Sequence, residues 1–335
     1  MTATHRPLGS TPPPVFPIGL GCMGMSEFYG ASDDAESLAT LARAVELGVM
    51  LFDTADTYGL GANEELLGRF IAEGGAARRA RMVIATKFGI VRQAGTYERR
   101  IDNSPAYIRA ACEASLQRLG VERIGLYYCH RRDPQVPLED MVGTLADLVR
   151  EGKVAAIGLS EVSAASLRTA HAVHPIAAVQ SEYSLWERGA EAEVLPTTRE
   201  LGVAFVAYSP LGRSFLTNQP PAADTLEPGD FRLALPRFQG EAGAANQTLQ
   251  QALAELAQSL GQPVAAIALA WLLQRQPHVL PIPGTRRLGH LQQNLAACSL
   301  VLPDAVMAQL DAMFAPGSVA GARYPDAGWA GVETR

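Results

Sequence analysis

The sequence lacks the features that mark membrane, secreted and nucleic-acid-binding proteins. No apolar run reaches the roughly 18 residues that a membrane span needs, and the opening segment MTATHRPLGSTPPPVFP has no charged head followed by an apolar core. The formal charge is −6, with basic residues scattered rather than gathered in a stripe. Neither nucleic acid nor a membrane is therefore an expected partner. We expect a cytoplasmic protein that acts on a small molecule, and a homo-oligomer is left open.

Cysteine is also scarce, and its positions are far apart. The chain has four cysteines, Cys22, Cys112, Cys129 and Cys298, without a C-x-x-C pair. This spacing argues against a disulfide framework and against a zinc site, so no metal is predicted. A reducing compartment fits this cysteine usage best.

Short apolar runs rich in β-formers recur along the whole chain. Eight such runs begin at Val15, Met50, Met82, Ile124, Val154, Ile176, Val203 and Val279. Segments of helical period lie between them, for example from Ser37 to Gly48 and from Pro105 to Gly120. Alternating strands and helices indicate a parallel sheet, and strands apolar throughout indicate burial on both faces. Without a linker in 335 residues, the pattern predicts one α/β domain over residues 1–335, a (β/α)8 TIM barrel.

Three segments do not fit the repeat. Residues 1–14 are expected to form a flexible N-terminus. The loop of residues 214–247, after the seventh strand, is unusually long and rich in Pro and Gly, and the tail after Pro316 has no regular period. Long loops in compact domains are often functional, so we expect the loop to act as a lid; whether it and the tail close over a site stays open.

The segment GLGCMG, residues 19–24, has the G-x-G-x-x-G spacing of a dinucleotide-binding turn. A Rossmann turn also needs a helix that starts at its third glycine and an acidic residue about 20 positions later at a strand end. Here the helical period starts only near Asp33 or Asp34, and position 44 lies within it. We therefore expect these glycines to line the barrel mouth and allow close approach by a ligand, without forming a Rossmann site.

Four titratable side chains follow three neighbouring strands. Asp53, Lys87 and His130 end the second, third and fourth strands, and Tyr58 lies in the loop after Asp53. In a barrel of this type such positions meet at one mouth, where the active site lies. A lysine at the end of the apolar run MVIAT needs a buried partner, and Asp53 is the natural one.

These side chains can act together on a carbonyl group. The Lys87 ammonium is expected to lower the pKa of Tyr58, which would donate a proton to a substrate oxygen while His130 donates a hydrogen bond to it. None of them is an electron source, so a cofactor must supply one, and hydride from a reduced nicotinamide fits. Two other interpretations stay open: Schiff-base chemistry on Lys87, and a cofactor-binding regulatory subunit without significant turnover.

Several segments together resemble the aldo-keto reductase superfamily, and most of all its microbial pyridoxal reductase-like branch. These are FDTADTYGLGANEELLG, ATKFG, YYCHRRD, GLSEVS, VQSEYSLWER, YSPLGRSFLT and PIPGTRR with the following QQN, and the resemblance extends from Val15 to Trp329. It implies an NADP-dependent oxidoreductase on a (β/α)8 barrel that reduces an aldehyde or ketone to an alcohol. It also implies that Asp53, Tyr58, Lys87 and His130 form the catalytic tetrad.

The resemblance also implies the residues that hold NADPH or NADP+. Ser160 and Gln180 match the positions that bind the nicotinamide carboxamide, and Glu161 stands where many relatives have Asn. Tyr208 matches the aromatic that stacks on the nicotinamide. The loop that crosses the pyrophosphate matches Ser209, Leu211, Gly212 and Arg213, and the adenosine phosphate and adenine site matches Gly284, Thr285, Arg286, His290, Gln293 and Asn294.

The segment GTRR, residues 284–287, supports a phosphate site without the resemblance. It supplies a small-residue turn, a hydroxyl and two guanidiniums, and arginine binds a phosphate monoester in a bidentate manner. We therefore expect NADPH to be preferred over NADH. The substrate-binding loops do not identify the carbonyl compound, and pyridoxal, aromatic aldehydes and small dicarbonyls all remain open.

Overall fold

The computed structural model describes residues 4–9, 11–93, 99–221 and 225–333. At its centre is one sheet of eight parallel strands. In chain order they are β3 (Leu20–Gly21), β4 (Leu51–Asp53), β5 (Val83–Phe88), β8 (Leu126–Cys129), β9 (Ile157–Ser160), β10 (Ala178–Glu182), β11 (Ala204–Tyr208) and β12 (Val279–Pro281). Each strand falls within one of the eight predicted apolar runs, so the strand prediction is confirmed.

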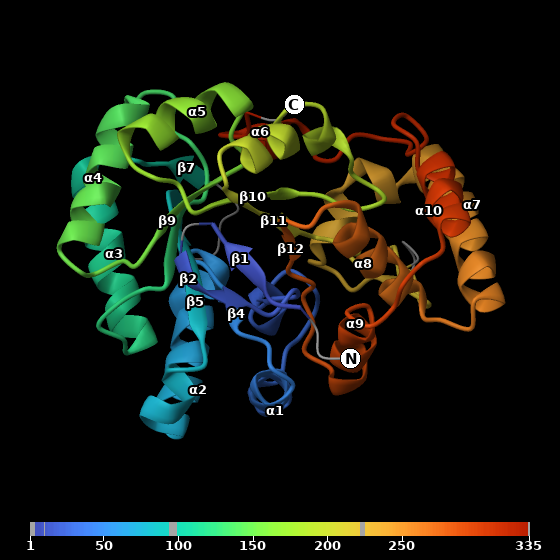
Figure 1. Ribbon diagram of the computed structural model, residues 1–335, viewed down its shortest axis with the longest axis horizontal. Helices are drawn as coiled ribbons and strands as arrows, with labels where there is room; N and C mark the ends of the chain where they lie inside the picture. The colour runs from blue at the N-terminus through green and yellow to red at the C-terminus, as the bar shows by residue number, and fades with distance from the viewer. Residues whose placement is uncertain (1–3, 10, 94–98, 222–224, 334–335) are drawn as a thin grey trace.

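Helices follow the strands and surround the sheet on its outer side (Figure 1). They are α1 (Asp34–Glu46), α2 (Ala62–Arg79), α3 (Pro105–Leu119), α4 (Leu138–Arg150), α5 (Ala164–Val173), α6 (Val194–Glu200), α7 (Gly240–Ser259), α8 (Val264–Arg275), α9 (Leu288–Ala296) and α10 (Asp304–Met313). Local sequence sets their ends. Ser104 caps α3 by accepting a hydrogen bond from the Tyr107 N–H, and Gly120 ends it with φ of 62°.

The sheet closes into a barrel where its first and last strands meet. Gly19 N–H donates to the Pro281 carbonyl at 3.0 Å, and Gly21 pairs with Gly284 in a parallel bridge. A Cβ on Gly21 would lie 2.9 Å from the Ile282 carbonyl oxygen. The first glycines of GLGCMG therefore allow strand-to-strand closure, a role that their sequence spacing did not indicate, and α1 begins only at Asp34, as expected without a Rossmann turn.

An N-terminal hairpin closes the other end of the barrel. Strand β1 (Arg6–Leu8) pairs antiparallel with β2 (Thr11–Val15), and Leu8 and Val15 are buried against side chains of the barrel interior. In Figure 1 this hairpin lies in front of the central strands. Residues 6–9 and 11–14 therefore adopt a defined structure where a flexible N-terminus was expected. Residues 1–3 and 10 lie outside the described part of the chain.

Two further segments extend the mouth of the barrel. The hairpin of β6 (Ile90–Arg92) and β7 (Arg99–Ile101) follows β5. The expected long loop contains short 3₁₀ turns at Phe231–Ala234 and Pro236–Phe238 and continues into α7, so its last residues are helical. Residues 222–224 of the loop and residues 334–335 of the tail are not described.

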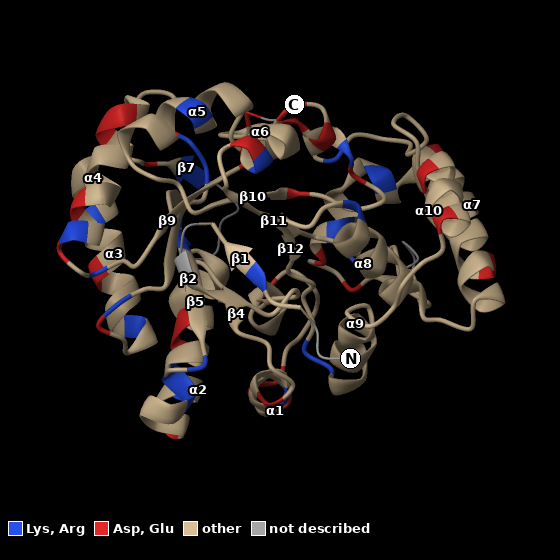
Figure 2. Ribbon diagram, viewed as in Figure 1, with Lys and Arg blue, Asp and Glu red and all other residues tan. Residues whose placement is uncertain are grey.

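The outer surface carries charges of both signs. Figure 2 shows acidic and basic residues mixed over α2, α3 and α4.

Within the described segments, no single helix has the length and apolarity needed to cross a membrane. Only α7 and α8 together, bent by 90° between them, meet those two criteria.

Candidate active site

The pleat of the strands directs the predicted side chains into the barrel. On β4, β5 and β8, the residues Leu51, Ala85 and Tyr128 belong to the interior core, while their neighbours Phe52, Ile84 and Cys129 pack outward. Side chains along a strand point alternately to its two faces. Asp53, Lys87 and His130 each lie two residues after one of these interior residues, so they also point into the barrel. Cys129 is a buried packing residue.

The structure brings the predicted tetrad together. The Lys87 Nζ atom lies 2.5 Å from Asp53 Oδ1, 2.7 Å from the Thr54 carbonyl oxygen and 3.2 Å from the Tyr58 hydroxyl. The Tyr58 and His130 rings meet edge to face, with centroids 5.9 Å apart. Asp53 Oδ2 also accepts a hydrogen bond from Gln180 Nε2 at 2.6 Å. The lysine is therefore fixed between a carboxylate and the phenol.

Burial and the neighbouring charges together decide the protonation states of Lys87 and Tyr58. Lys87 is fully buried, which alone would lower its pKa, but Asp53 raises that pKa above its ordinary value. Burial raises the pKa of Tyr58, and the Lys87 ammonium opposes this shift without reversing it. The prediction that Lys87 lowers the pKa of Tyr58 below its ordinary value is therefore wrong. The resting residue is a protonated phenol that can donate its proton.

His130 is held in its neutral form. Burial lowers the pKa of His130 well below its ordinary value, and the positive charges of Arg131, Lys87 and Arg99 lower it further. Its Nδ1 atom is buried and has no hydrogen-bond partner among the described residues, and His130 lines a large pocket. A neutral imidazole can donate one hydrogen bond to a developing oxyanion but is a poor proton source.

This protonation state predicts a flat pH profile near the ordinary pKa of histidine. Between pH 6 and pH 8, His130 stays neutral and Tyr58 stays protonated, so kcat for a non-ionisable aldehyde should not change with pH through either group. Steady-state rates across this range, with saturating cofactor, would test it. An inflection near pH 6.5 that disappears in His130→Gln would show that the imidazole titrates there and would contradict this assignment.

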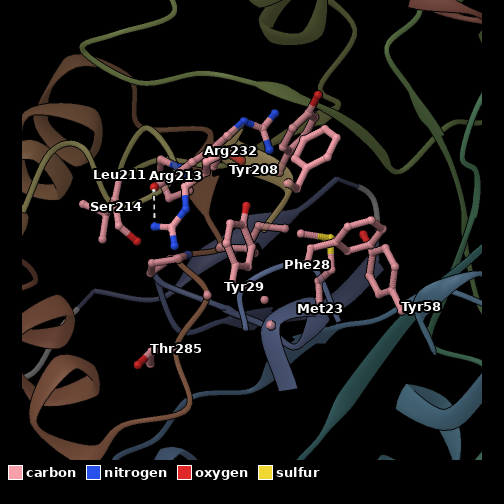
Figure 3. Close-up of a pocket in the computed structure, with 18 of the residues that line it drawn as sticks. Met23, Phe28, Tyr29, Tyr58, Tyr208, Leu211, Arg213, Ser214, Arg232 and Thr285 are labelled. Atoms are coloured by element: carbon pink, nitrogen blue, oxygen red, sulfur yellow. Dashed lines mark hydrogen bonds between the residues drawn. The ribbon is translucent and has the colours of Figure 1, made fainter. Parts of the chain in front are cut away.

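A deep pocket connects the tetrad with the last strand. Its volume is about 1080 Å³, and Asp53, Tyr58 and His130 line it at one end while Arg286, His290 and Asn294 line it at the other. In Figure 3, Tyr58, Phe28 and Met23 lie on one side and Leu211, Ser214 and Thr285 on the opposite side. The volume exceeds the roughly 300–1,000 Å³ usual for one small ligand. The pocket can therefore hold an extended ligand beside a small substrate.

The carboxamide and nicotinamide positions lie at the tetrad end of this pocket. Ser160, Gln180 and Tyr208 all line it. The Ser160 Oγ accepts a hydrogen bond from Arg131, and the Gln180 amide is bound to Asp53. Gln180 therefore connects the predicted carboxamide position directly to the tetrad.

The loop after β11 borders the pocket in a constrained conformation. Ser209, Leu211 and Arg213 line the pocket, and Ser209 and Arg213 have positive φ. Gly212 is not a lining residue: its φ is 54°, and a Cβ there would lie 2.4 Å from Trp186. Trp186 packs with Phe215 and Phe238, away from the large pocket.

The predicted phosphate and adenine positions gather at the far end of the pocket. Gly284, Thr285, Arg286, His290, Gln293 and Asn294 all line it, together with Arg287. Arg286 donates to the carbonyl oxygens of Gly24, Tyr29 and Gly30 at 3.2 to 3.5 Å. These acceptors are neutral, so the positive charge of Arg286 remains available to a phosphate.

The C-terminal tail closes one wall of the mouth through buried ion pairs. Arg323 binds Glu161 at 2.8 Å, and Arg213 binds Glu182 at 2.9 Å. The Tyr324 hydroxyl lies 2.8 Å from the Tyr208 hydroxyl and 3.0 Å from Arg213. Glu161, which stands where many relatives have Asn, is thus bound to the tail.

Several pocket residues were missed from the sequence. Arg99, Arg131, Arg232 and Tyr324 all line the pocket. Arg131 directly follows His130, and that position was the one signal that could have revealed it. The others reach the pocket from a hairpin, a loop and a tail whose paths no sequence period indicates.

Comparisons with known proteins agree with this geometry. The model of the aldo/keto reductase family matches residues 17–315. The structure is similar to a glycerol dehydrogenase of Gluconobacter oxydans, with a TM-score of 0.83, 29% identity and coverage of 95% of this chain and 98% of that one. An aldo-keto reductase of Klebsiella pneumoniae solved with NADPH aligns with a TM-score of 0.73, 27% identity and coverage of 97% and 99%. Another from Klebsiella pneumoniae, solved with NADP and acetate, aligns with a TM-score of 0.69, 27% identity and coverage of 93% and 95%.

Proposed function

Because the chain belongs to the aldo/keto reductase family, whose members use NADP(H), we propose that it reduces an aldehyde or ketone to an alcohol with NADPH. The observation that carries the proposal is the buried Asp53–Lys87–Tyr58 arrangement beside His130 at one end of the pocket. The pyridoxal reductase-like branch stays a prediction, and the substrate is taken up below.

The residues of the pocket fit the cofactor. The two guanidiniums of Arg286 and Arg287 suit a phosphate monoester, and Tyr208 offers a ring near the tetrad for the nicotinamide. When bound, NADPH supplies the hydride that none of the side chains can supply. Ser160 and Gln180 would orient the carboxamide, and the loop from Ser209 to Arg213 would border the pyrophosphate.

The tetrad performs the proton transfer. Tyr58 donates its phenolic proton to the substrate oxygen, and the Lys87 ammonium stabilises the phenolate that remains. Asp53 keeps Lys87 charged and oriented, while Gln180 holds the second oxygen of that carboxylate. His130 donates a hydrogen bond to the same substrate oxygen as negative charge develops on it.

The arrangement around Lys87 argues against Schiff-base chemistry. The side chain is fully buried, and its ammonium already has three acceptors in Asp53, the Thr54 carbonyl and Tyr58. A nucleophilic lysine needs a free, neutral amine. We expect borohydride to trap no aldehyde on Lys87. A regulatory subunit without turnover stays an alternative that the rate measurements below decide.

The cofactor preference should depend on Arg286. We expect Arg286→Ala to raise the Kd for NADPH about 10- to 100-fold more than that for NADH, since a charge-assisted contact contributes about 1.5–3 kcal/mol and only NADPH carries the extra phosphate. Fluorescence titration with both cofactors measures this. An equal loss of affinity for both cofactors would show that Arg286 does not bind the extra phosphate. The contact would then be assigned to Arg287, whose exposed side chain lines the same end of the pocket.

A further inference from the structure

We infer that the substrate carries a negatively charged group, a carboxylate or a phosphate, bound by Arg99 and Arg131 beside His130. This inference rests on the proposed carbonyl reduction and adds the substrate class. Both guanidinium-bearing residues line the pocket at its catalytic end.

The hairpin β6–β7 places like charges against each other at the pocket. Arg92 pairs directly with Arg99 across the hairpin, and Ile90, Arg92 and Arg99 all line the pocket. Like charges opposite each other on two strands are destabilising. Arg92 is neutralised by Glu27, whose two oxygens lie 3.2 and 2.8 Å from its guanidinium nitrogens. Arg99 has no such partner in the described segments of the chain.

Arg99 is held only by neutral groups. Its guanidinium donates to the carbonyl oxygens of Ala327 and Gly328 in the tail, at 3.2 and 3.1 Å. These contacts fix the side chain at the rim of the pocket without compensating its charge. Arg99 is exposed as a whole at this rim, but burial of its guanidinium lowers its pKa, and the positive charge of Arg131 lowers that pKa further. The two cations therefore repel each other.

Arg131 is a buried cation whose hydrogen-bond acceptors are also neutral. It is 7% exposed, and it donates to the His130 carbonyl at 2.6 Å and to Ser160 Oγ at 3.1 Å. No carboxylate among the described residues lies within ion-pair distance of Arg131. Burial alone would lower the pKa of Arg131, but Tyr208, Tyr324 and Glu161 raise it above its ordinary value, and Glu161 is itself bound to Arg323. A buried charge without a counter-ion is costly, so a ligand that supplies one would be bound strongly.

The other arginines of the pocket are either neutralised by a carboxylate or lie at its opposite end. Arg213 is paired with Glu182, and Arg232 with Asp230. Arg286 and Arg287 lie at the opposite end, where the cofactor phosphate is proposed to bind. Arg99 and Arg131 instead lie near His130, since their charges lower its pKa. An anion bound by these two arginines would therefore be part of the substrate at the catalytic end, not the cofactor phosphate. Planar guanidiniums match the oxygens of a carboxylate or a phosphate.

The test compares substrates that differ mainly in charge. With wild-type protein and NADPH, kcat/KM would be measured for 3- and 4-formylbenzoate against their methyl esters, and for glyceraldehyde 3-phosphate against glyceraldehyde. We expect at least one anion to exceed its neutral counterpart about tenfold or more. Its KM should rise with added NaCl, because salt screens the attraction. A larger anion-to-neutral ratio of kcat/KM for the formylbenzoates would indicate a carboxylate, and a larger ratio for glyceraldehyde 3-phosphate would indicate a phosphate.

Two neighbouring arginines give a matched pair of variants. In Arg99→Gln, the anion-to-neutral ratio of kcat/KM should fall about tenfold or more. Arg100→Gln should leave the ratio unchanged, because Arg100 pairs with Asp102 and does not line the pocket. Arg131→Gln should lower the ratio as well, with circular dichroism to show that it folds, since this side chain also contacts Ser160.

The outcomes separate this inference from the proposed function. Reduction of the neutral aldehydes without preference for any anion, or an unchanged ratio in Arg99→Gln, overturns the inference and leaves carbonyl reduction intact. Reduction of none of the aldehydes overturns the proposed function, and the inference with it.

Discussion

A Tyr58→Phe variant is expected to bind NADPH as the wild-type protein does and to lose carbonyl reduction about 10²- to 10⁴-fold in kcat, the usual contribution of a positioned general acid. The substitution removes only the hydroxyl that lies 3.2 Å from Lys87 Nζ. The ring keeps its contact with His130 and its place in the pocket wall. Steady-state rates with a neutral aldehyde, combined with cofactor titration, measure both effects.

Tyr127→Phe provides the matched control. Tyr127 is also a buried tyrosine, on β8, but it packs on the outer side of the barrel, and its hydroxyl has no hydrogen-bond partner in the part of the chain that the structure describes. Removing that hydroxyl should leave kcat within about twofold. If Tyr58→Phe kept wild-type turnover, another group would be the proton donor and the mechanism proposed above would be wrong.

A Lys87→Met variant is expected to lose about 3–5 kcal/mol in the free energy of unfolding, because it leaves the Asp53 carboxylate buried without its cation. Turnover should also fall strongly, since the Tyr58 phenolate would have no positive charge beside it. Chemical denaturation followed by fluorescence gives the stability change, and the rate assay is the one used for Tyr58→Phe.

The double variant Asp53→Asn/Lys87→Met separates stability from catalysis. Replacing both charges removes the unpaired carboxylate, so this variant should unfold at a higher denaturant concentration than Lys87→Met alone. It should remain as inactive as the single variant. Equal stability of Lys87→Met and the wild-type protein would show that the ion pair is not held as the structure has it.

The barrel was predictable because each strand is a short continuous run of apolar residues, and such runs recur along the chain between helical segments. Each run buries residues on both faces, so the signal is strong even where a strand is short, as in Leu51–Asp53. The hairpin β1–β2 was not predicted, because Pro12, Pro13 and Pro14 suggest an irregular segment. Proline is tolerated on an edge strand, and β2 pairs only with β1.

The tetrad was also predictable, since strand ends of a parallel barrel meet at one mouth. Its electrostatics were not, because the degree of burial around Tyr58 depends on the whole pocket wall. The tail was missed for a related reason. Arg323 contacts Glu161 across 162 positions of sequence, and such a pair leaves no spacing pattern. The same holds for Arg99, on strand β7, and Arg131, in the loop after β8, which line the same pocket.

The most direct test of the central claim is one titration followed by one addition. Purified protein would be titrated with NADPH and, separately, NADH by fluorescence, and 4-nitrobenzaldehyde would then be added while the absorbance of the reduced nicotinamide is followed. We predict tighter binding of NADPH than of NADH and oxidation of NADPH once the aldehyde is present. Absence of NADPH binding would contradict the assignment of the pocket, and tight binding without oxidation of NADPH by any aldehyde of the panel above would contradict catalysis by the tetrad.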